Sequence, residues 1–526
     1  MGRYLHRYPT TTKVESHEAL GENLAASPAT SLQETLMASN PEQTVHQRQH
    51  DCQNLMASVT GPEACSPTAY EVELTLFRRL LALGAARLRL FFVTRAAIRP
   101  AAPLTAPDGR RLTSHAQRPT TDYAVFGNVH LWRHDFTGPG QTGLCPLDAA
   151  LRVPARWYAD VLREWAAYGT TDASSRESQT VLARILGLSL SIQALDTSLV
   201  DAACAVTAFY DQPPALPPPV TVGTILVVQA DGTGVPRVPP STAAPAVRLG
   251  KGQKRTKKQE AVVTGLSTIA PSQRPPQDVV AALLQEPARP ARAARPVPIG
   301  QALRATLDGQ AVAMTRLVPR VAPRDAVSIQ HRVALTAGAE ALPQQLLSHC
   351  PQYPLVLDIL HATAYLWDTA NALLGDTAPG RTPWVRPHLE QVRAGQTDAV
   401  MTALTTEAND PTRTAAQQRA VLRTVGYYQR NRPYRHYDTS LARGWPMGTG
   451  VVEGAGGHLV QDRMEQAGMR WTKAGAQAVL DLRAVRINGH WDAYGQWHRP
   501  QHHQRVYGTS TPVPEVVEAQ GLELAA

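Results

Sequence analysis

The order of strand-like and helix-like segments between residues 223 and 374 constrains the fold more than any other feature of the chain. Five segments have the apolar pattern of strands: 223–231, 235–238, 260–269, 331–336 and 353–358. Three have helical patterns: 300–316, 337–349 and 361–374. Strands with short connections form an antiparallel meander, and strands joined through helices run parallel. The order therefore predicts an α/β fold with a mixed five-stranded sheet and helices on its faces.

This sheet has the ribonuclease-H-like arrangement, and the sequence around it suggests how the rest of the chain is organised. The segments before residue 213 are mainly helical, apart from a strand or hairpin pattern at 123–135, and the region after 375 has no strand pattern. The expected parts are a variable, partly disordered leader with a helical segment (1–120), a mainly helical N-terminal domain that is a candidate for DNA binding (121–212), a Pro-rich linker (213–222), the first part of the core (223–375), a helical insertion (376–445), the last part of the core (446–495) and a polar tail (496–526).

Two helices in the N-terminal domain raise the question of a helix-turn-helix. The first opens with the capping-box residues Ser174 and Glu177, and the second is expected over 191–210. The second helix carries Asp196 and Asp201 and no Lys or Arg, which suits a phosphate-lined groove badly. Two interpretations stay open for it: a DNA-recognition helix, and a packing or dimer helix, which the acidic residues favour.

Composition excludes several classes of protein. The 526 residues include 52 Lys and Arg against 43 Asp and Glu, a formal net charge of +9 that is compatible with a nucleic-acid partner. The five cysteines have no CxxC spacing, so neither a disulfide framework nor a thiolate zinc site is expected. No run approaches the ~18 apolar residues that span a bilayer. We therefore expect no membrane partner.

Three acids stand at the ends of core segments. Asp231 follows one apolar strand and Asp358 follows another, whereas Glu453 opens a helix after a Gly-rich turn. Carboxylates that cluster at a sheet end are hard oxygen ligands of the kind that Mg²⁺ binds. Two such ions activate the attacking oxygen and stabilise the leaving oxygen in phosphodiester chemistry. For any single acid, a solvated turn residue is the simpler explanation.

Several stretches between about 124 and 495 resemble a known family. They are FGNVHLWR, LCPLDAALRVPARWY, VVQADGTGVPRVPP, RLGKGQKRTKKQEAVVTGLSTIAP, RVALTAGAEALPQQL, LVLDILHATAYLW, YYQRNRPYRHYD and GWPMGTGVVEGAGGHLVQDRMEQAGMRWTKAGAQAVLDLRAVRINGHWDAY. In this order they resemble the insertion-sequence DDE transposases of the ISKra group. The resemblance implies a ribonuclease-H-like core that uses Mg²⁺ or Mn²⁺, with Asp231 as the first acid and Glu453 as the last.

The second acid of that family is missing from this chain. In the family, the strand that corresponds to RVALT is followed by Asp-Gly, whereas this chain has Ala337 and Gly338. Position 337 suits the second acid because the fourth strand of this fold lies beside the first, about 4.8 Å away. Asp358 ends the fifth strand, about another 4.8 Å farther out.

Two interpretations follow for the acids. Either Asp358 reaches the metal ions and the working set is Asp231, Asp358 and Glu453, or Ala337 marks a copy whose metal site has lost a ligand. Asp358 also forms the spacing Asp358-x-x-His361 at a strand-to-helix junction. This pair suits a helix cap with a packed imidazole, a phosphate-binding group or a metal ligand, and the cap is the simplest of the three.

Two basic segments are candidate DNA contacts. The loop 248–258 carries six cations and no acid, and we expect it to contact the DNA backbone through Lys251, Lys254, Arg255, Lys257 and Lys258. A second candidate surface, or else a domain core, is formed by Arg430, Arg432, Arg435, Arg463 and Arg470 with Tyr427, Tyr428, Tyr434 and Trp471. Four C-terminal histidines are expected in or beside the polar tail, without metal: His490, His498, His502 and His503.

These observations lead to two functional hypotheses. The first is a DNA transposase that cuts and rejoins the ends of its insertion sequence. The second is an impaired relic that only binds DNA. A host nuclease lacks support because the resemblance covers the C-terminal signature. By the same resemblance we expect double-stranded DNA (transposon ends and target) as partner, a homodimer or higher oligomer on DNA, and a bacterial, nucleoid-associated location in the cytoplasm.

Overall fold

The computed structural model describes residues 53–54, 56–57, 59–61, 67–96, 104–105, 111–112, 114–138, 145–153, 158–211, 223–238, 258–286, 295–325, 327–338, 341–466 and 468–507. The chain forms two compact units. The first comprises 1–122, 128–147 and 513–526, and the second comprises 123–127 and 148–512.

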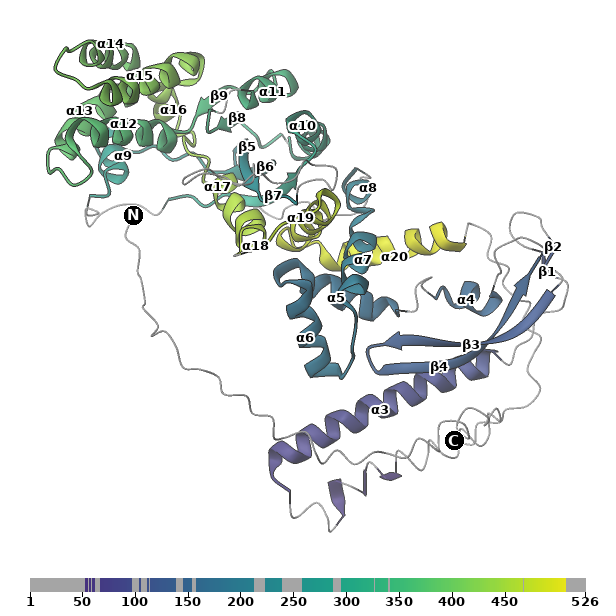
Figure 1. Ribbon diagram of the computed structural model, residues 1–526. Coiled ribbons are helices and arrows are strands. Elements are labelled where there is room, and N and C mark those ends of the chain that lie inside the picture. The colour runs from purple at the N-terminus through teal and green to yellow at the C-terminus, as the bar shows by residue number, and fades with distance from the viewer. Residues whose placement is uncertain are drawn as a thin grey trace, which may run out of the picture. The chain divides into compact units, whose positions relative to one another are not determined.

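The first unit contains a long helix and short strands (Figure 1). Its described elements are α3 (Ala69–Ala96), β1 (Leu104–Thr105), β2 (Arg111–Leu112) and most of the hairpin β3 (Ser114–Ala124) and β4 (Gly127–Thr137). The helix expected over 71–93 and the hairpin expected near 123–135 are both confirmed. A buried ion pair between Arg133 and Asp122 links the two hairpin strands. The short helix α4 (Pro146–Leu151) lies at the boundary of the two units.

A mixed five-stranded sheet is the centre of the second unit. Its strands are β5 (Ile225–Val235), β6 (Gln259–Ile269), β7 (Ile299–Thr306), β8 (His331–Thr336) and β9 (Leu355–Leu357). The order is β7-β6-β5-β8-β9, with β6 antiparallel to both neighbours and β5, β8 and β9 parallel. This α/β topology, with helices on the sheet, is compatible with the ribonuclease-H-like arrangement.

One of the five expected strands, at 235–238, is not present. These residues do not pair back on the first strand; β5 runs on to Val235, and Arg237 forms an isolated bridge with Trp471. The third strand is instead β7, at the start of the segment 300–316 that was expected to be helical. Leu303 and Ala305 are buried against other elements, and the helix α10 (Gln310–Leu317) begins only after Gly309. Pairing with β6 therefore overrides the local helical pattern.

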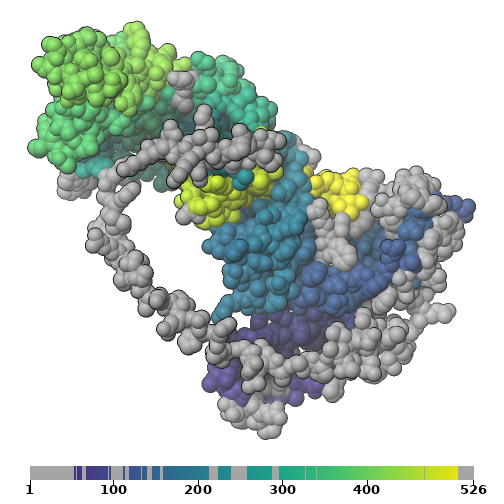
Figure 2. Space-filling view, viewed as in Figure 1, coloured from purple at the N-terminus to yellow at the C-terminus, as the bar shows by residue number. Residues whose placement is uncertain are grey.

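Helices cover the two faces of the sheet differently. One face carries Ile225, Val227 and Leu335 and packs against α9 (Pro276–Leu283) and α12 (Ile359–Leu374). The other face packs against α10 and α11 (Leu342–His349). The apolar core on the first of these faces extends among four further helices, which form most of the green lobe of Figure 2. These are α13 (Arg381–Arg393), α14 (Thr397–Ala408), α15 (Ala415–Arg430) and α16 (Tyr437–Ala442).

The chain returns to the sheet through its C-terminal helices. These are α17 (Gly450–Ala455), the π-helical segment η5 (Gly456–Gln461), α18 (Asp462–Met464), α19 (Lys473–Ile487) and α20 (Trp491–Tyr507). Part of the segment expected as a polar tail from 496 onward is therefore helical through Tyr507. The helix α17 packs closely on β6, since a Cβ at Gly265 would lie 2.9 Å from the side chain of Val452.

Four helices precede the sheet: α5 (Asp160–Asp172), α6 (Ser175–Leu186), α7 (Ile192–Ala203) and α8 (Val206–Asp211). The capping box of Ser174 and Glu177 is confirmed, and the single helix expected over 191–210 is divided into α7 and α8. The inner face of α7 is buried against α5 and α19, which supports a packing role. Among the described helices, only Ile192–Asp211 passes as a membrane span by length and composition, and much of it lies in this core.

Candidate functional site

Asp231 stands near the middle of the long strand β5, one residue beyond the last pair that β5 forms with β8. That pair is Ala230 with Thr336. The Asp231 side chain is partly exposed, and its Oδ1 accepts a 2.8 Å hydrogen bond from the N–H of Gly232. By strand alternation Asp231 lies on the same sheet face as Val227 and Gln229. This is the face that α12 and α17 cover.

Asp358 is fully buried and acts as the N-cap of α12. Its Oδ1 accepts a 2.6 Å hydrogen bond from the N–H of Leu360. Its Oδ2 accepts hydrogen bonds from both the N–H, at 2.8 Å, and the hydroxyl of Thr449. His361 Nδ1 lies 3.5 Å from the same oxygen. Both oxygens are therefore engaged by the protein, which favours the cap over the metal ligand for this residue.

Glu453 lies exposed on α17, close to the strand that carries Asp231. The N–H of Val452, its neighbour, donates a 3.3 Å hydrogen bond to Gln229 Oε1 on β5. The N–H of Glu453 itself donates to the carbonyl of Thr449 at 3.0 Å. Thr449 thus connects the Asp358 carboxylate to the first turn of the helix that carries Glu453. Sequence analysis missed Thr449, although it stands in the Gly-Thr-Gly turn before the acid.

The three acids and His361 are near enough to influence the pKa values of Asp231 and His361. Burial raises the pKa of Asp231, and the charges of Asp358 and Glu453 raise it further, while His361 acts against them. The Asp358 carboxylate, 3.5 Å from Nδ1, raises the pKa of His361 most, with help from Asp231 and Glu453. Burial would raise the pKa of Asp358, but His361, Thr449 and Leu360 together hold it below its usual range.

Ala337 directly follows β8, the strand beside β5. It follows Thr336 as Asp231 follows Ala230, and Ala230 with Thr336 is the last pair between the two strands. Alternation puts its side chain on the face of Leu335, which is also the face of Asp231. The Tyr427 hydroxyl donates a 3.0 Å hydrogen bond to the carbonyl of Ala337 and fixes its backbone. A methyl group therefore stands where a carboxylate would face Asp231.

A divalent-ion site does not fit the residues that are present. Asp231 and Glu453 retain free carboxylate oxygens, Asp358 is closed by its cap contacts, and position 337 has no ligand atom. Among the residues that the structure describes, no group of three or more His, Cys, Asp and Glu side chains forms a metal-ligand set. Mg²⁺ and Mn²⁺ prefer hard oxygen ligands, and here two carboxylates rather than three are open to such an ion.

The expected DNA contacts have different outcomes. Lys251, Lys254, Arg255 and Lys257 lie outside the described residues. Lys258 is exposed, and its side chain packs over Gly234, three residues beyond Asp231 on β5. Its Nζ forms an ion pair with Glu465 at 2.7 Å.

Arg470 is exposed beside Trp471, whose backbone pairs with Pro236 and Val238 just beyond β5. It therefore stays a candidate cation for the DNA backbone near the C-terminal end of β5.

Arg463 does not lie on a surface, contrary to its expected contact with DNA. It is 2% exposed, its Nε and Nη2 donate to the carbonyl of Thr170 at 3.3 and 3.4 Å, and its guanidinium lies 4.6 Å from the ring centroid of Trp471. Arg483, which sequence analysis missed, donates to the carbonyls of Thr171 and Leu459 at 2.6 and 3.0 Å. Both arginines join the end of α5 to the C-terminal helices.

The aromatic set of the second candidate surface is mostly core. Tyr427 and Tyr428 are almost fully buried, and their hydroxyls donate to backbone carbonyls of Ala337 and Ala362. Arg435 is 6% exposed and pairs with Asp398 at 3.0 Å. These contacts show that the core interpretation, rather than base stacking, accounts for these rings.

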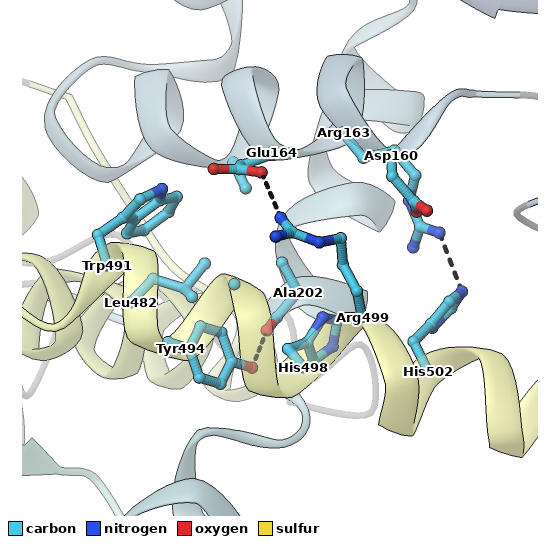
Figure 3. A pocket seen from close by; sticks show the side chains of 12 residues that line it. Asp160, Arg163, Glu164, Ala202, Leu482, Trp491, Tyr494, His498, Arg499 and His502 are labelled. Carbon is cyan, nitrogen blue, oxygen red and sulfur yellow. Dashed lines mark hydrogen bonds and ion pairs between the residues drawn. The ribbon is translucent and has the colours of Figure 1, made fainter. Parts of the chain in front are cut away.

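Two of the four histidines expected in a polar tail, His498 and His502, line a cavity of about 60 Å³ between α5, α7, α19 and α20. Figure 3 shows its lining, which includes none of the three acids. His502 lies 3.0 Å from Arg163, and Glu164 pairs with Arg499 at 3.0 Å. Burial, with nearby cations, lowers the pKa of His498 to about 4, so this ring is neutral at pH 7. The cavity is a closed packing seam between helices.

Comparisons with known proteins do not identify a family for this chain. No protein-family model matches it, and no curated protein matches it. A search of solved structures finds the Drosophila P element transposase strand transfer complex, with 8% sequence identity and a TM-score of 0.28, over 65% of this chain and 97% of that one. A likeness of this size does not bear on function.

Proposed function

We propose that the chain is a transposase-type protein that binds the DNA ends of an insertion sequence and has an impaired cleavage site. The observation that carries this proposal is that Ala337, and no acid, directly follows the last residue of β8 that pairs with β5, as Asp231 follows its partner Ala230, while Asp358 is closed as a helix cap. The protein keeps the scaffold of a phosphodiester-processing site and lacks the ligand at its centre.

The number of carboxylates open to a metal ion decides how well such a site can work. Phosphodiester cleavage on such a scaffold needs carboxylates that together match the charge of divalent ions. Two open carboxylates, Asp231 and Glu453, match less of that charge than three. The rate penalty for the missing ligand amounts to orders of magnitude, because each 1.36 kcal/mol of lost transition-state stabilisation is tenfold in rate.

DNA binding rests on separate support. The chain has a net charge of +9, and the exposed cations Lys258 and Arg470 lie near the C-terminal end of β5, the strand that carries Asp231. Cations of this kind supply backbone affinity that falls with salt and is independent of base sequence. The motifs around GTGVVEGA and DRMEQAGMRW, which resemble those of insertion-sequence transposases, make element ends the expected DNA.

A working transposase is the second candidate. The mutual influence of Asp231, Asp358, Glu453 and His361 on the pKa values of Asp231 and His361 supports it. For this candidate, Asp358 would have to leave its cap contacts with Thr449 and Leu360 when DNA binds.

Strand cleavage distinguishes the two candidates. The substrate is an end-labelled duplex from the ends of the element, with Mg²⁺ or Mn²⁺, and the proteins are the wild type, Ala337→Asp and the neutral isostere Ala337→Asn. We expect all three to bind the duplex equally and only Ala337→Asp to cut it, with a further Asp231→Asn change abolishing the cutting. Equal cutting by the wild type and Ala337→Asp overturns the impaired site, and absence of binding overturns the proposal as a whole.

A further inference from the structure

The helix α3 has a regular apolar seam. Its apolar positions recur with alternating spacings of four and three residues along the helix: Tyr70, Leu74, Phe77, Leu81, Gly84, Leu88 and Phe91. This is the heptad spacing of a coiled coil, and Arg95 occupies the next position. The helix has 28 residues, so the seam runs for about 42 Å.

The seam has its three aromatic side chains exposed and its four other positions half-buried. Tyr70 is 71% exposed, Phe77 is 41% exposed and Phe91 is 40% exposed, and Leu80 beside the seam is 47% exposed. Among the described side chains of α3 none is fully buried. Large apolar side chains that recur on one face of a surface helix mark an interaction site. The sequence pattern is therefore one that needs a partner helix.

We propose that the partner is the α3 helix of a second copy of this chain, packed antiparallel. In an antiparallel pair centred on the middle of α3, the residue numbers of facing seam positions sum to 165. Leu74 then faces Phe91 of the second copy, and Leu88 faces Phe77. Leu81 faces Gly84, so the large side chain enters the space that the glycine leaves. Each of these layers thus combines a larger side chain with a smaller residue opposite it, as in the knobs-into-holes packing of a coiled coil.

Charge supports the antiparallel direction. Arg95 faces Tyr70 of the second copy, where a guanidinium can lie on the aromatic ring as it already does on Phe91 within one chain, 4.2 Å from the centroid. The acids Glu71 and Glu73 in the first turns come near the same Arg95. A parallel pair would instead place Arg95 against Arg95 and Gly84 against Gly84. Like charges and a hole in the seam make that direction unfavourable.

This surface is independent of the acids and of the proposed function, since it forms without DNA or metal. The test is the solution mass of the full chain at micromolar concentration, measured by size exclusion with light scattering. We expect twice the chain mass of 57.0 kDa for the wild type and a single mass for Phe77→Glu/Phe91→Glu. Leu422→Glu, at an exposed leucine on α15, is the matched control and keeps the dimer. Circular dichroism verifies that each variant is folded.

Disulfide trapping tests the direction. In a background with the five native cysteines replaced by serine, a mixture of Phe77→Cys and Leu88→Cys chains should form a mixed disulfide, because facing Cβ atoms of such a seam meet the geometry of that bond. Phe77→Cys alone should not link to itself, since its two copies lie about 16 Å apart along the seam. A monomeric wild type, a dimer that survives Phe77→Glu/Phe91→Glu, or self-linking of Phe77→Cys overturns the proposal.

Discussion

Asp231 and Ala337 each follow directly on Ala230 and Thr336, the last pair between the parallel strands β5 and β8, so that Ala337 begins the turn after β8 while β5 continues through Asp231. The consequence is electrostatic. The pKa of Asp231 is already raised by burial and by the charges of Asp358 and Glu453. A further carboxylate at position 337 would add a like charge next to it.

Ala337→Asp should therefore lower the stability of the metal-free protein at pH 7 by about 1 to 2 kcal/mol. Mg²⁺ or Mn²⁺ should reverse the loss, since saturation at 100 times Kd contributes about 2.7 kcal/mol. Thermal unfolding with and without the ion measures both effects. Ala337→Asn adds the same volume without charge, and should show neither. An Ala337→Asp protein whose melting temperature ignores the ion would contradict the placement of position 337.

Gly338 allows the turn that follows Ala337. Its φ is +85°, and a Cβ there would lie 2.6 Å from Leu357 Cδ1 and 3.1 Å from Asn431 Nδ2. Gly338→Ala should lower the free energy of unfolding by about 3 kcal/mol, from the left-handed backbone and the overpacking together. Denaturant titration measures it. Gly380→Ala is the control, because φ there is −73° and the only contact is at 3.9 Å. Equal losses of unfolding free energy for the two changes would show that position 338 has no special need for glycine.

Asp358→Ala should destabilise the protein by about 3 kcal/mol, because it removes a helix cap and leaves the N–H and hydroxyl of buried Thr449 without an acceptor. Chemical denaturation at pH 7 measures the loss. Asp368→Ala, on the exposed side of the same helix, should have a far smaller effect. Comparable losses at the two positions would show that the cap is unimportant.

The pH dependence follows from the same contacts. The folded pKa of Asp358 is depressed, so its contribution is present above about pH 4 and is lost as the pH falls through the folded value. The folded pKa of His361 is raised, so its contribution is complete below about pH 6.5 and is lost as the pH rises through the folded value. The stability of the wild type relative to Asp358→Asn should thus be greatest between about pH 4 and 6.5. A difference that grows steadily above pH 7 would contradict this pairing.

The sheet was predictable where burial and pattern agree. The strands that became β5, β6, β8 and β9 are apolar runs bounded by turn residues, and the pattern places them within a few residues. The strand β7 was not predictable in this way, because Gln301 and Arg304 interrupt its apolar pattern. Arg304 is buried by contacts with Thr207 and Asp481, which are distant in sequence. Only the tertiary partners make that segment a strand.

The sequence singles out acids for the candidate site but not their contacts. It places Asp231 at the end of a strand and Glu453 after a Gly-rich turn; Asp231 instead lies within β5, and the role of both acids stays a prediction. The cap role of Asp358 depends on Thr449, 91 residues farther along the chain, and no local pattern connects the two. Arg463 stands in a basic and aromatic stretch that is typical of a nucleic-acid surface. In the structure it is buried instead, because it donates a hydrogen bond to the carbonyl of Thr170, which is distant in sequence.

Arg463 and Arg470 should therefore separate stability from DNA binding. Arg463→Met should lower the free energy of unfolding by about 2 to 3 kcal/mol, since the carbonyl of Thr170 loses its donor in a buried place. Arg470 is exposed, so Arg470→Met should leave stability unchanged. It should weaken binding to a duplex of any sequence, and it should reduce the slope of log affinity against log salt by about 0.9, the value for one phosphate contact.

Each arginine serves as the control for the other in this comparison. Denaturant titration measures stability, and fluorescence anisotropy with a labelled duplex at several salt concentrations measures the slope. Arg463→Met, measured at a temperature where it stays folded, should keep the wild-type slope because a side chain that is 2% exposed contacts no phosphate. A reduced slope for Arg463→Met would mean that the core contacts open on DNA. An unchanged slope for Arg470→Met would remove the C-terminal end of β5 from the DNA-binding surface.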